Sequence, residues 1–150
     1  MDLSANTGCY GALGEVGVGW RFAKEVMMTH ESLTSLRAPE AVGAYVHAKK
    51  VGHLLFLAGI GPRVRGQKEI PGVYSDAEGN VIAHEIEVQA ENVIANVKMV
   101  LEEAGSSLEK VIEVRVFLTD MKDDFQKFNR IFAKHFQNIP CTRTTVEVGA

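Results

Sequence analysis

The sequence predicts an α+β fold in which two helices pack on one face of a β-sheet. Three observations lead to this prediction. Two segments carry apolar residues at helical spacing, each is followed by a segment of strand-like alternation, and two shorter strand-like runs come before them. The predicted order is strand, strand, helix, strand, helix, strand, which is typical of a sheet with its helices on one side.

The first two strands are expected at residues 44–48 and 53–59, joined by a hairpin-sized turn at residues 49–52. Residues 54–58 are apolar throughout, so this strand is expected to be buried on both faces. Glycine and proline then break regular structure over residues 59–73, in the kind of loop that often carries functional backbone.

After a turn at residues 78–80, the first helix is expected over residues 85–104, where apolar side chains recur every three or four positions and Gly105 is a C-cap. Asp120 is the expected N-cap of the second helix, which residues 138–140 end. A stripe of phenylalanines at helical spacing in this helix is interpreted as core: Phe125, Phe128, Phe132 and Phe136.

The last two strands are expected at residues 111–119 and 142–148, where apolar residues alternate with a mixed face. That mixed face is expected to carry Phe117, Arg115 and Arg143 rather than a purely solvated surface. Two helices cannot cover both faces of the sheet, so we expect a homo-oligomer in which sheets face one another.

The length and composition of the chain limit the classes of protein to which it can belong. The chain has 150 residues, enough for one compact domain, and its net charge of −3 gives no basic excess for a nucleic acid partner. No apolar stretch is long enough for a membrane helix and the first residues do not form a secretory signal, so a cytoplasmic location is expected. Cys9 and Cys141 have no metal-ligand spacing, so we expect reduced thiols and no metal site.

Residues 1–36 are glycine-rich and show no sustained period, so they are expected to be an N-terminal extension that is not part of the fold. The organised domain is then expected at residues 37–150.

Arg143 is the strongest candidate for a binding residue. It lies in the middle of a predicted strand, where a guanidinium needs a carboxylate partner. That partner is either a ligand or one of Glu147 and Glu113, and both interpretations stay open. Tyr45 either contributes its phenol to a site or is an ordinary strand tyrosine.

Gly59 either lets a ligand approach the backbone or serves a tight strand exit. His84 is the histidine to consider for proton transfer, because it follows the glycine-rich loop and precedes the first helix. The chain has no phosphate-binding loop, dinucleotide fingerprint, serine nucleophile motif or paired cysteine nucleophile. Most cofactor-dependent and covalent chemistries are thereby excluded, and no cofactor is expected.

Taken together, several segments resemble the Rid family, the small enamine/imine deaminases also called the YjgF family. The most specific match is Thr142–Val148, because the family places a carboxylate-binding arginine just before a Val-Glu-Val-type strand. The other matching segments are Ala38–Tyr45, Ala58–Gly59, Asn96–Lys98 and Val111–Thr119. Within the family, Ala58–Arg63 and Thr145 are similar to the 2-aminomuconate deaminases of aromatic-compound degradation.

The resemblance implies a chorismate-mutase-like subunit in a homotrimer or homohexamer, with sites between subunits. It implies that Arg143 binds the substrate α-carboxylate, Gly59 offers backbone groups and Tyr45 lines the site, with Thr145 beside them. Arg63 either binds the second carboxylate of 2-aminomuconate or is a solvent-exposed loop arginine. The family has one more strand, with a glutamate, after the position of Ala150, so the domain is expected to lack that strand.

The expected activity is hydrolysis of the enamine/imine of 2-aminomuconate to 4-oxalocrotonate and ammonia, without a cofactor. A carboxylate, water or His84 would then transfer protons. Two alternatives remain. One is a general deaminase of 2-iminobutanoate and 2-iminopropanoate, and the other is a non-catalytic oligomer that binds small carboxylates.

Overall fold

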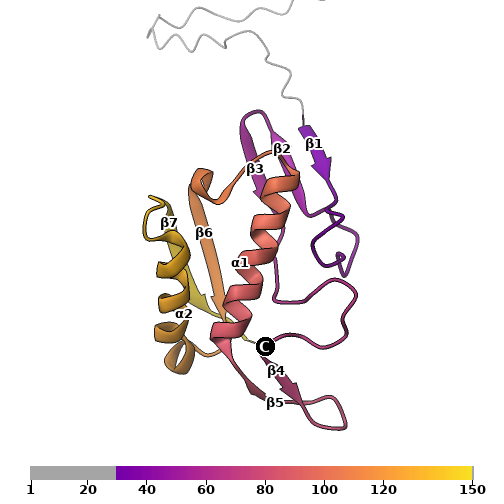
Figure 1. Ribbon diagram of the computed structural model, residues 1–150, viewed down its shortest axis with the longest axis vertical. Helices are drawn as coiled ribbons and strands as arrows, with labels where there is room; N and C mark the ends of the chain where they lie inside the picture. Colours follow the sequence, from indigo (N-terminus) through magenta and orange to yellow (C-terminus); the bar gives the residue numbers. More distant parts are fainter. Residues whose placement is uncertain (1–29, 150) are drawn as a thin grey trace, which may run out of the picture.

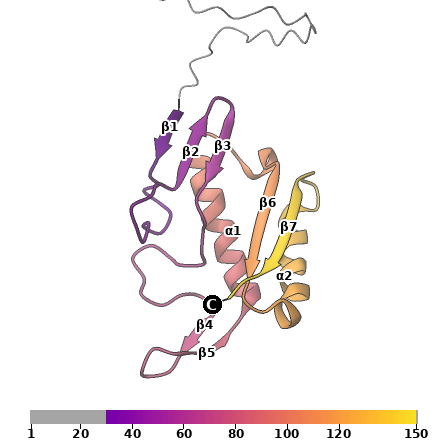
Figure 2. The same cartoon turned by 180° about the vertical axis from the view of Figure 1, so that it is seen from behind.

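The computed structural model describes residues 30–149. Its two long helices, α1 (Ile86–Glu103) and α2 (Met121–Phe136), lie in front of the strands in Figure 1 and behind them in Figure 2. The predicted α+β class, with two helices on one face, is therefore confirmed. Neither helix combines the length and the apolar character that crossing a membrane requires.

The strands form three small sheets rather than the single sheet that the sequence predicts. The first is antiparallel, the second is a hairpin, and the third is a parallel pair joined through α2. Their members are β1 (His30–Leu33), β2 (Ala48–Val51) and β3 (Leu54–Leu57); β4 (Val73–Ser75) and β5 (Val81–His84); β6 (Glu113–Leu118) and β7 (Thr142–Glu147). A short 3₁₀ helix, η1 (Leu108–Lys110), precedes β6.

Residues 30–36 belong to the fold, contrary to the expected boundary at residue 36. The strand β1 pairs with β2, with His30 opposite Val51 and Leu33 opposite Ala48. It is short and mostly polar, so it has no apolar period that sequence inspection can detect. The rest of the expected extension, residues 1–29, lies outside the described residues.

The first hairpin lies further along the chain than predicted. The strand β2 begins at Ala48, and Lys49 and Lys50 are strand residues rather than turn residues. Val51 pairs with Leu54, which leaves a two-residue turn where Gly52 adopts a φ of 58°. This φ favours glycine and fixes the turn. Tyr45 consequently lies in a loop and not in a strand.

Helix α1 joins all parts of the core. It contributes to three apolar clusters, and each cluster connects it to a different part of the molecule. The clusters are Ala90 with Leu118 and Phe128, Ile94 with Leu108 and Phe136, and Val100 with Ala38 and Ala48. The phenylalanine stripe of α2 is thus confirmed as core.

The strand faces turned away from the helices are apolar and exposed. Leu55 and Leu57 of β3 pack into the core, whereas Leu54 is 50% exposed and Phe56 is 58% exposed. Burial of β3 on both faces is therefore not achieved within one chain. Phe117 of β6 is also exposed, at 64%.

The predicted helix ends are confirmed by their caps. The Asp120 side chain accepts a hydrogen bond from the N–H of Asp123, at 2.9 Å, at the start of α2. Gly105 has a φ of 72° just after α1. The turn expected at residues 78–80 is the loop of the β4–β5 hairpin, whose two short strands the sequence analysis did not predict.

Candidate functional site

A pocket lies between the loop that precedes β2 and the loop that follows β3. Tyr45, Gly59 and Arg63, three of the predicted site residues, line it. These three residues therefore lie together, whereas Arg143, which was expected in the same site, does not line this pocket. Gly59 has open space where a side chain would begin, so its backbone is accessible to a ligand.

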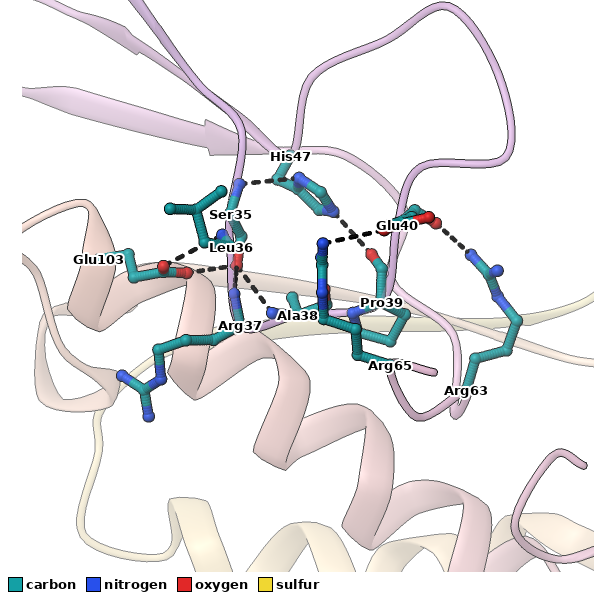
Figure 3. Close-up of polar contacts among 10 residues, drawn as sticks. All are labelled: Ser35, Leu36, Arg37, Ala38, Pro39, Glu40, His47, Arg63, Arg65 and Glu103. Atoms are coloured by element: carbon teal, nitrogen blue, oxygen red, sulfur yellow. Dashed lines mark hydrogen bonds and ion pairs between the residues drawn. The ribbon is translucent and has the colours of Figure 1, made fainter. Parts of the chain in front are cut away.

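The Ser35 hydroxyl organises the first wall of the pocket (Figure 3). It donates a hydrogen bond to the Glu103 carboxylate of α1 and accepts one from the backbone N–H of Ala38 at 2.8 Å. Glu103 also accepts from the N–H of Leu36 at 3.1 Å. Ser35 is only 2% exposed, so its hydroxyl group depends on these bonds rather than on water.

His47 continues this network. The N–H of Ser35 donates to His47 Nδ1 at 3.0 Å, and Nε2 lies 2.8 Å from the carbonyl oxygen of Pro39. Since Nδ1 faces a donor and Nε2 faces an acceptor, the proton of the neutral ring is assigned to Nε2. His47 is only 6% exposed and supports the pocket wall, a role that its sequence context does not indicate.

Asn96 of α1 fixes the opposite wall. Its Nδ2 donates to the carbonyl oxygens of Gly61, at 3.0 Å, and Arg63, at 2.8 Å. It is 5% exposed, so both bonds are shielded from water. Sequence reasoning did not assign it to a site, although a polar residue among the apolar positions Val93, Val97 and Val100 is a usable signal.

Arg143 lies on a different part of the molecule. It faces α2, whereas the sequence placed it with Phe117 on the mixed face of the sheet; Phe117 is opposite Val146, three residues further along β7. Its guanidinium carbon lies 4.6 Å from the ring centroid of Phe132 in α2, and the rings of Phe125 and Phe128 are also within cation–π distance. Thr145 shares this face of β7, and within residues 30–149 its buried hydroxyl has no hydrogen-bond partner.

The interpretation of Arg143 as half of an ion pair with Glu147 or Glu113 is wrong. Glu147 accepts a hydrogen bond from the N–H of Met121 at 2.7 Å, and Glu113 is bound by Arg115 at 3.1 Å. No carboxylate in the described part of the chain pairs with Arg143. The guanidinium therefore keeps its N–H donors for another acceptor.

His84 forms a third group. Its Nε2 lies 2.7 Å from Oδ2 of Asp124, a carboxylate at the start of α2. The Asp124 side chain is 4% exposed and that of His84 is 34% exposed, so the pair connects the interior with solvent. Asp124 was not predicted, because it lies 40 residues away in sequence and only the packing of α1 against α2 brings it to His84.

The structure does not gather these three groups within one chain. The loops that carry Tyr45 and Gly59 lie on one side of α1, whereas β7, with Arg143, lies on the other side in both Figure 1 and Figure 2. No three histidine, cysteine, aspartate or glutamate side chains of residues 30–149 cluster as they would around a metal ion.

A family model and the similar curated proteins relate this chain to one family. Residues 35–150 match a family model described as Endoribonuclease L-PSP. A RutC family protein of Pyrococcus abyssi is 36% identical over 127 residues, which cover 85% of this chain and 86% of that protein. Protein HMF1 of Saccharomyces cerevisiae is 38% identical over 113 residues, which cover 75% of this chain and 78% of that protein.

Solved structures give the same result for the fold. The crystal structure of yeast Mmf1 has a TM-score of 0.65 and 31% identity, covering 81% of this chain and 87% of the other. Escherichia coli TdcF with bound serine has a TM-score of 0.65 and 29% identity, covering 79% and 85%.

We expect Asn96→Leu to release the loop after β3. The variant loses both donors and leaves two carbonyl groups unpaired, which lowers the free energy of unfolding by about 1–3 kcal/mol. Trypsin cleavage after Arg63 and Arg65 should become faster than in the wild type. The control is Asn92→Leu on the same helix, since Asn92 bonds only the Val88 carbonyl oxygen. Equal cleavage rates in all three proteins would contradict this role.

We expect the Ser35–Glu103 contact to stabilise the fold only above acidic pH. The Ser35 hydroxyl, followed by the N–H of Leu36, holds the pKa of Glu103 below its ordinary value of 4.5. A lowered folded-state pKa stabilises the protein above that value, and the stabilisation is lost as the pH falls through the folded-state pKa. Urea unfolding should show the difference between wild type and Glu103→Gln shrinking under acid. In a Ser35→Ala background this pH dependence should be weaker, and an unchanged dependence would refute the assignment.

Proposed function

The chain belongs to the Endoribonuclease L-PSP family, whose members are also called Rid, YjgF or RutC proteins, and we propose that it is a cofactor-independent deaminase of enamine and imine acids. The observation that carries this proposal is the guanidinium of Arg143, which is half-buried on three phenylalanine rings and has no carboxylate partner among residues 30–149. A cation of this kind is suited to the α-carboxylate of an amino-acid-derived substrate. That the similar TdcF carries bound serine supports a site for such a carboxylate.

The specific substrate that we propose is 2-aminomuconate. The support is the resemblance of Ala58–Arg63 and Thr145 to the deaminases of this compound. The substrate has two carboxylates, one for Arg143 and a second for the arginine-containing loop that follows β3.

The reaction needs positioning, charge and proton transfer. Protonation of a carbon of the conjugated chain converts the enamine to the 2-imine, water adds to C2, and the C–N bond breaks to release ammonia and leave the 2-oxo acid, 4-oxalocrotonate. Arg143 would hold the carboxylate beside C2, while Gly59 and Tyr45 would orient the rest of the substrate. His84, held through Nε2 by Asp124, keeps Nδ1 for moving a proton between substrate and water.

The proposed site is completed by association of subunits into a trimer or a dimer of trimers. Two observations support this proposal. The groups that the reaction needs are on opposite sides of α1 within one chain. The strand faces opposite the helices expose apolar side chains, including Phe117 and its cross-strand partner Val146.

RNA is not the substrate in this proposal, although the family description contains the word endoribonuclease. The chain has 16 Lys and Arg residues against 19 Asp and Glu residues. Such a balance provides no net basic excess to neutralise a phosphate backbone.

We expect Arg143→Ala to lower kcat/KM for freshly generated 2-aminomuconate by about a hundredfold or more, since a charge-assisted contact with the substrate is lost. Ammonia release and loss of ultraviolet absorbance measure the turnover. The matched control is Arg130→Ala, because Arg130 lies on α2, away from the sheet faces proposed to associate, is exposed, and pairs with Glu87 at 2.9 Å.

The same assay distinguishes the proposed function from its alternatives. Ammonia release from imines derived from 2-aminoacrylate, but not from 2-aminomuconate, would indicate the general deaminase. Absence of ammonia release from both substrates would refute deamination and leave the carboxylate-binding oligomer as the alternative.

We expect Phe117→Asp to prevent assembly without unfolding the chain, because a charge would be placed in the contact between sheets. Sedimentation velocity should show a trimer or hexamer for the wild type and a smaller species for the variant, with circular dichroism unchanged. The control is Lys127→Asp, a charge change on the solvent side of α2. A monomeric wild type would refute the proposed assembly.

A further inference from the structure

Two arginines of the loop after β3 bind the opposite wall of the pocket (Figure 3). Arg65 donates from Nη1 to the carbonyl oxygen of Ala38 at 3.0 Å and from Nη2 to Oε1 of Glu40 at 2.9 Å. Arg63 donates from Nη2 to the carbonyl oxygen of Glu40 at 2.8 Å. Arg63 lines the pocket itself, and Arg65 bonds two of the residues that line it, Ala38 and Glu40, from just behind the wall.

The carboxylate of Glu40 is the group that a ligand can displace from these hydrogen bonds. Its side chain is 78% exposed, and its hydrogen bonding to Arg65 is a single contact. Exposed ion pairs of this kind add little to stability, so displacing Glu40 is energetically easy.

Arg65 itself is fixed. Its second hydrogen bond goes to the backbone of Ala38, a residue that is 1% exposed and belongs to a core cluster. The guanidinium therefore keeps its position when the Glu40 carboxylate leaves. Among residues 30–149, Arg63 bonds a single backbone oxygen, so further N–H donors remain beside the same place.

We propose that Glu40 occupies the place of a ligand carboxylate, and that a dicarboxylate entering the pocket displaces it from Arg65. Arg65, with Arg63 beside it, then selects dicarboxylates over monocarboxylates. A ligand carboxylate bound by both arginines gains more charge-assisted hydrogen bonds than the single one that Glu40 makes. The inference rests on the proposed function, because it assigns the second carboxylate of the proposed substrate to a named residue.

The test compares two unreactive probes with the same carbon skeleton, hexa-2,4-dienedioate and hexa-2,4-dienoate, by isothermal titration calorimetry on the full chain. The wild type should bind the dicarboxylate about tenfold more tightly, the equivalent of one charge-assisted hydrogen bond. Arg65→Gln should bring this ratio close to one without changing the affinity for the monocarboxylate. Glu40→Gln should raise the affinity for the dicarboxylate only, because the internal competitor is lost.

Arg37→Gln is the matched control. Arg37 is an exposed arginine whose side chain pairs with Glu102 at 3.0 Å, and, unlike the partners of Arg65, Glu102 does not line the pocket. A wild type without discrimination, an unchanged ratio in Arg65→Gln, or weaker dicarboxylate binding by Glu40→Gln would each overturn the proposal. These failures are separable from failure of the proposed function, which is absence of ammonia release by the wild type.

Discussion

The pocket depends on one constraint, which is that the segment from Ser35 to His47 has no helix or strand of its own and is held to α1 through its buried residues Ser35 and Ala38. Buried backbone N–H groups need partners, and regular structure does not supply them here. The Ser35 hydroxyl serves the N–H groups of Arg37 and Ala38, and the His47 ring serves the N–H of Ser35. Glu103 then ties this arrangement to the last turn of α1. Because Asn96 binds the facing loop from the same helix, α1 sets the separation of both pocket walls.

The phenylalanine stripe of α2 has two roles that follow from the same geometry. Phe128 and Phe136 are buried and fill the core between α1 and α2. The ring of Phe132, between them, also lies under the guanidinium of Arg143. Ring faces attract the cation without using its N–H donors. A carboxylate partner would instead have neutralised the charge, so the aromatic support keeps Arg143 available for an anion.

The sequence predicted what periodicity and capping control, but not what depends on tertiary contacts. The helices, the Asp120 cap and the core stripe were predictable because each depends on residues close in the chain. The strand β1 was not, because its polar residues acquire strand geometry only by pairing with β2. The roles of Asn96 and Asp124 were also missed, since their partners lie 33 to 40 residues away and composition does not reveal which polar groups meet.

The separation of the site groups and the exposure of the strand faces have one common explanation in the proposed assembly. Burying an exposed phenylalanine or leucine stabilises by about 1.5–3 kcal/mol. Phe117, Val146, Leu54 and Phe56 are at least 39% exposed, so several such contributions are available at each subunit. Their sum is comparable to the estimated cost of association, about 4–15 kcal/mol. A contact through these strands would also bring β7 of one subunit toward a neighbour. Burial of the apolar strand faces would then contribute the energy of association. Arg143 requires such an association to meet a pocket, since the pocket of the same chain lies on the far side of α1.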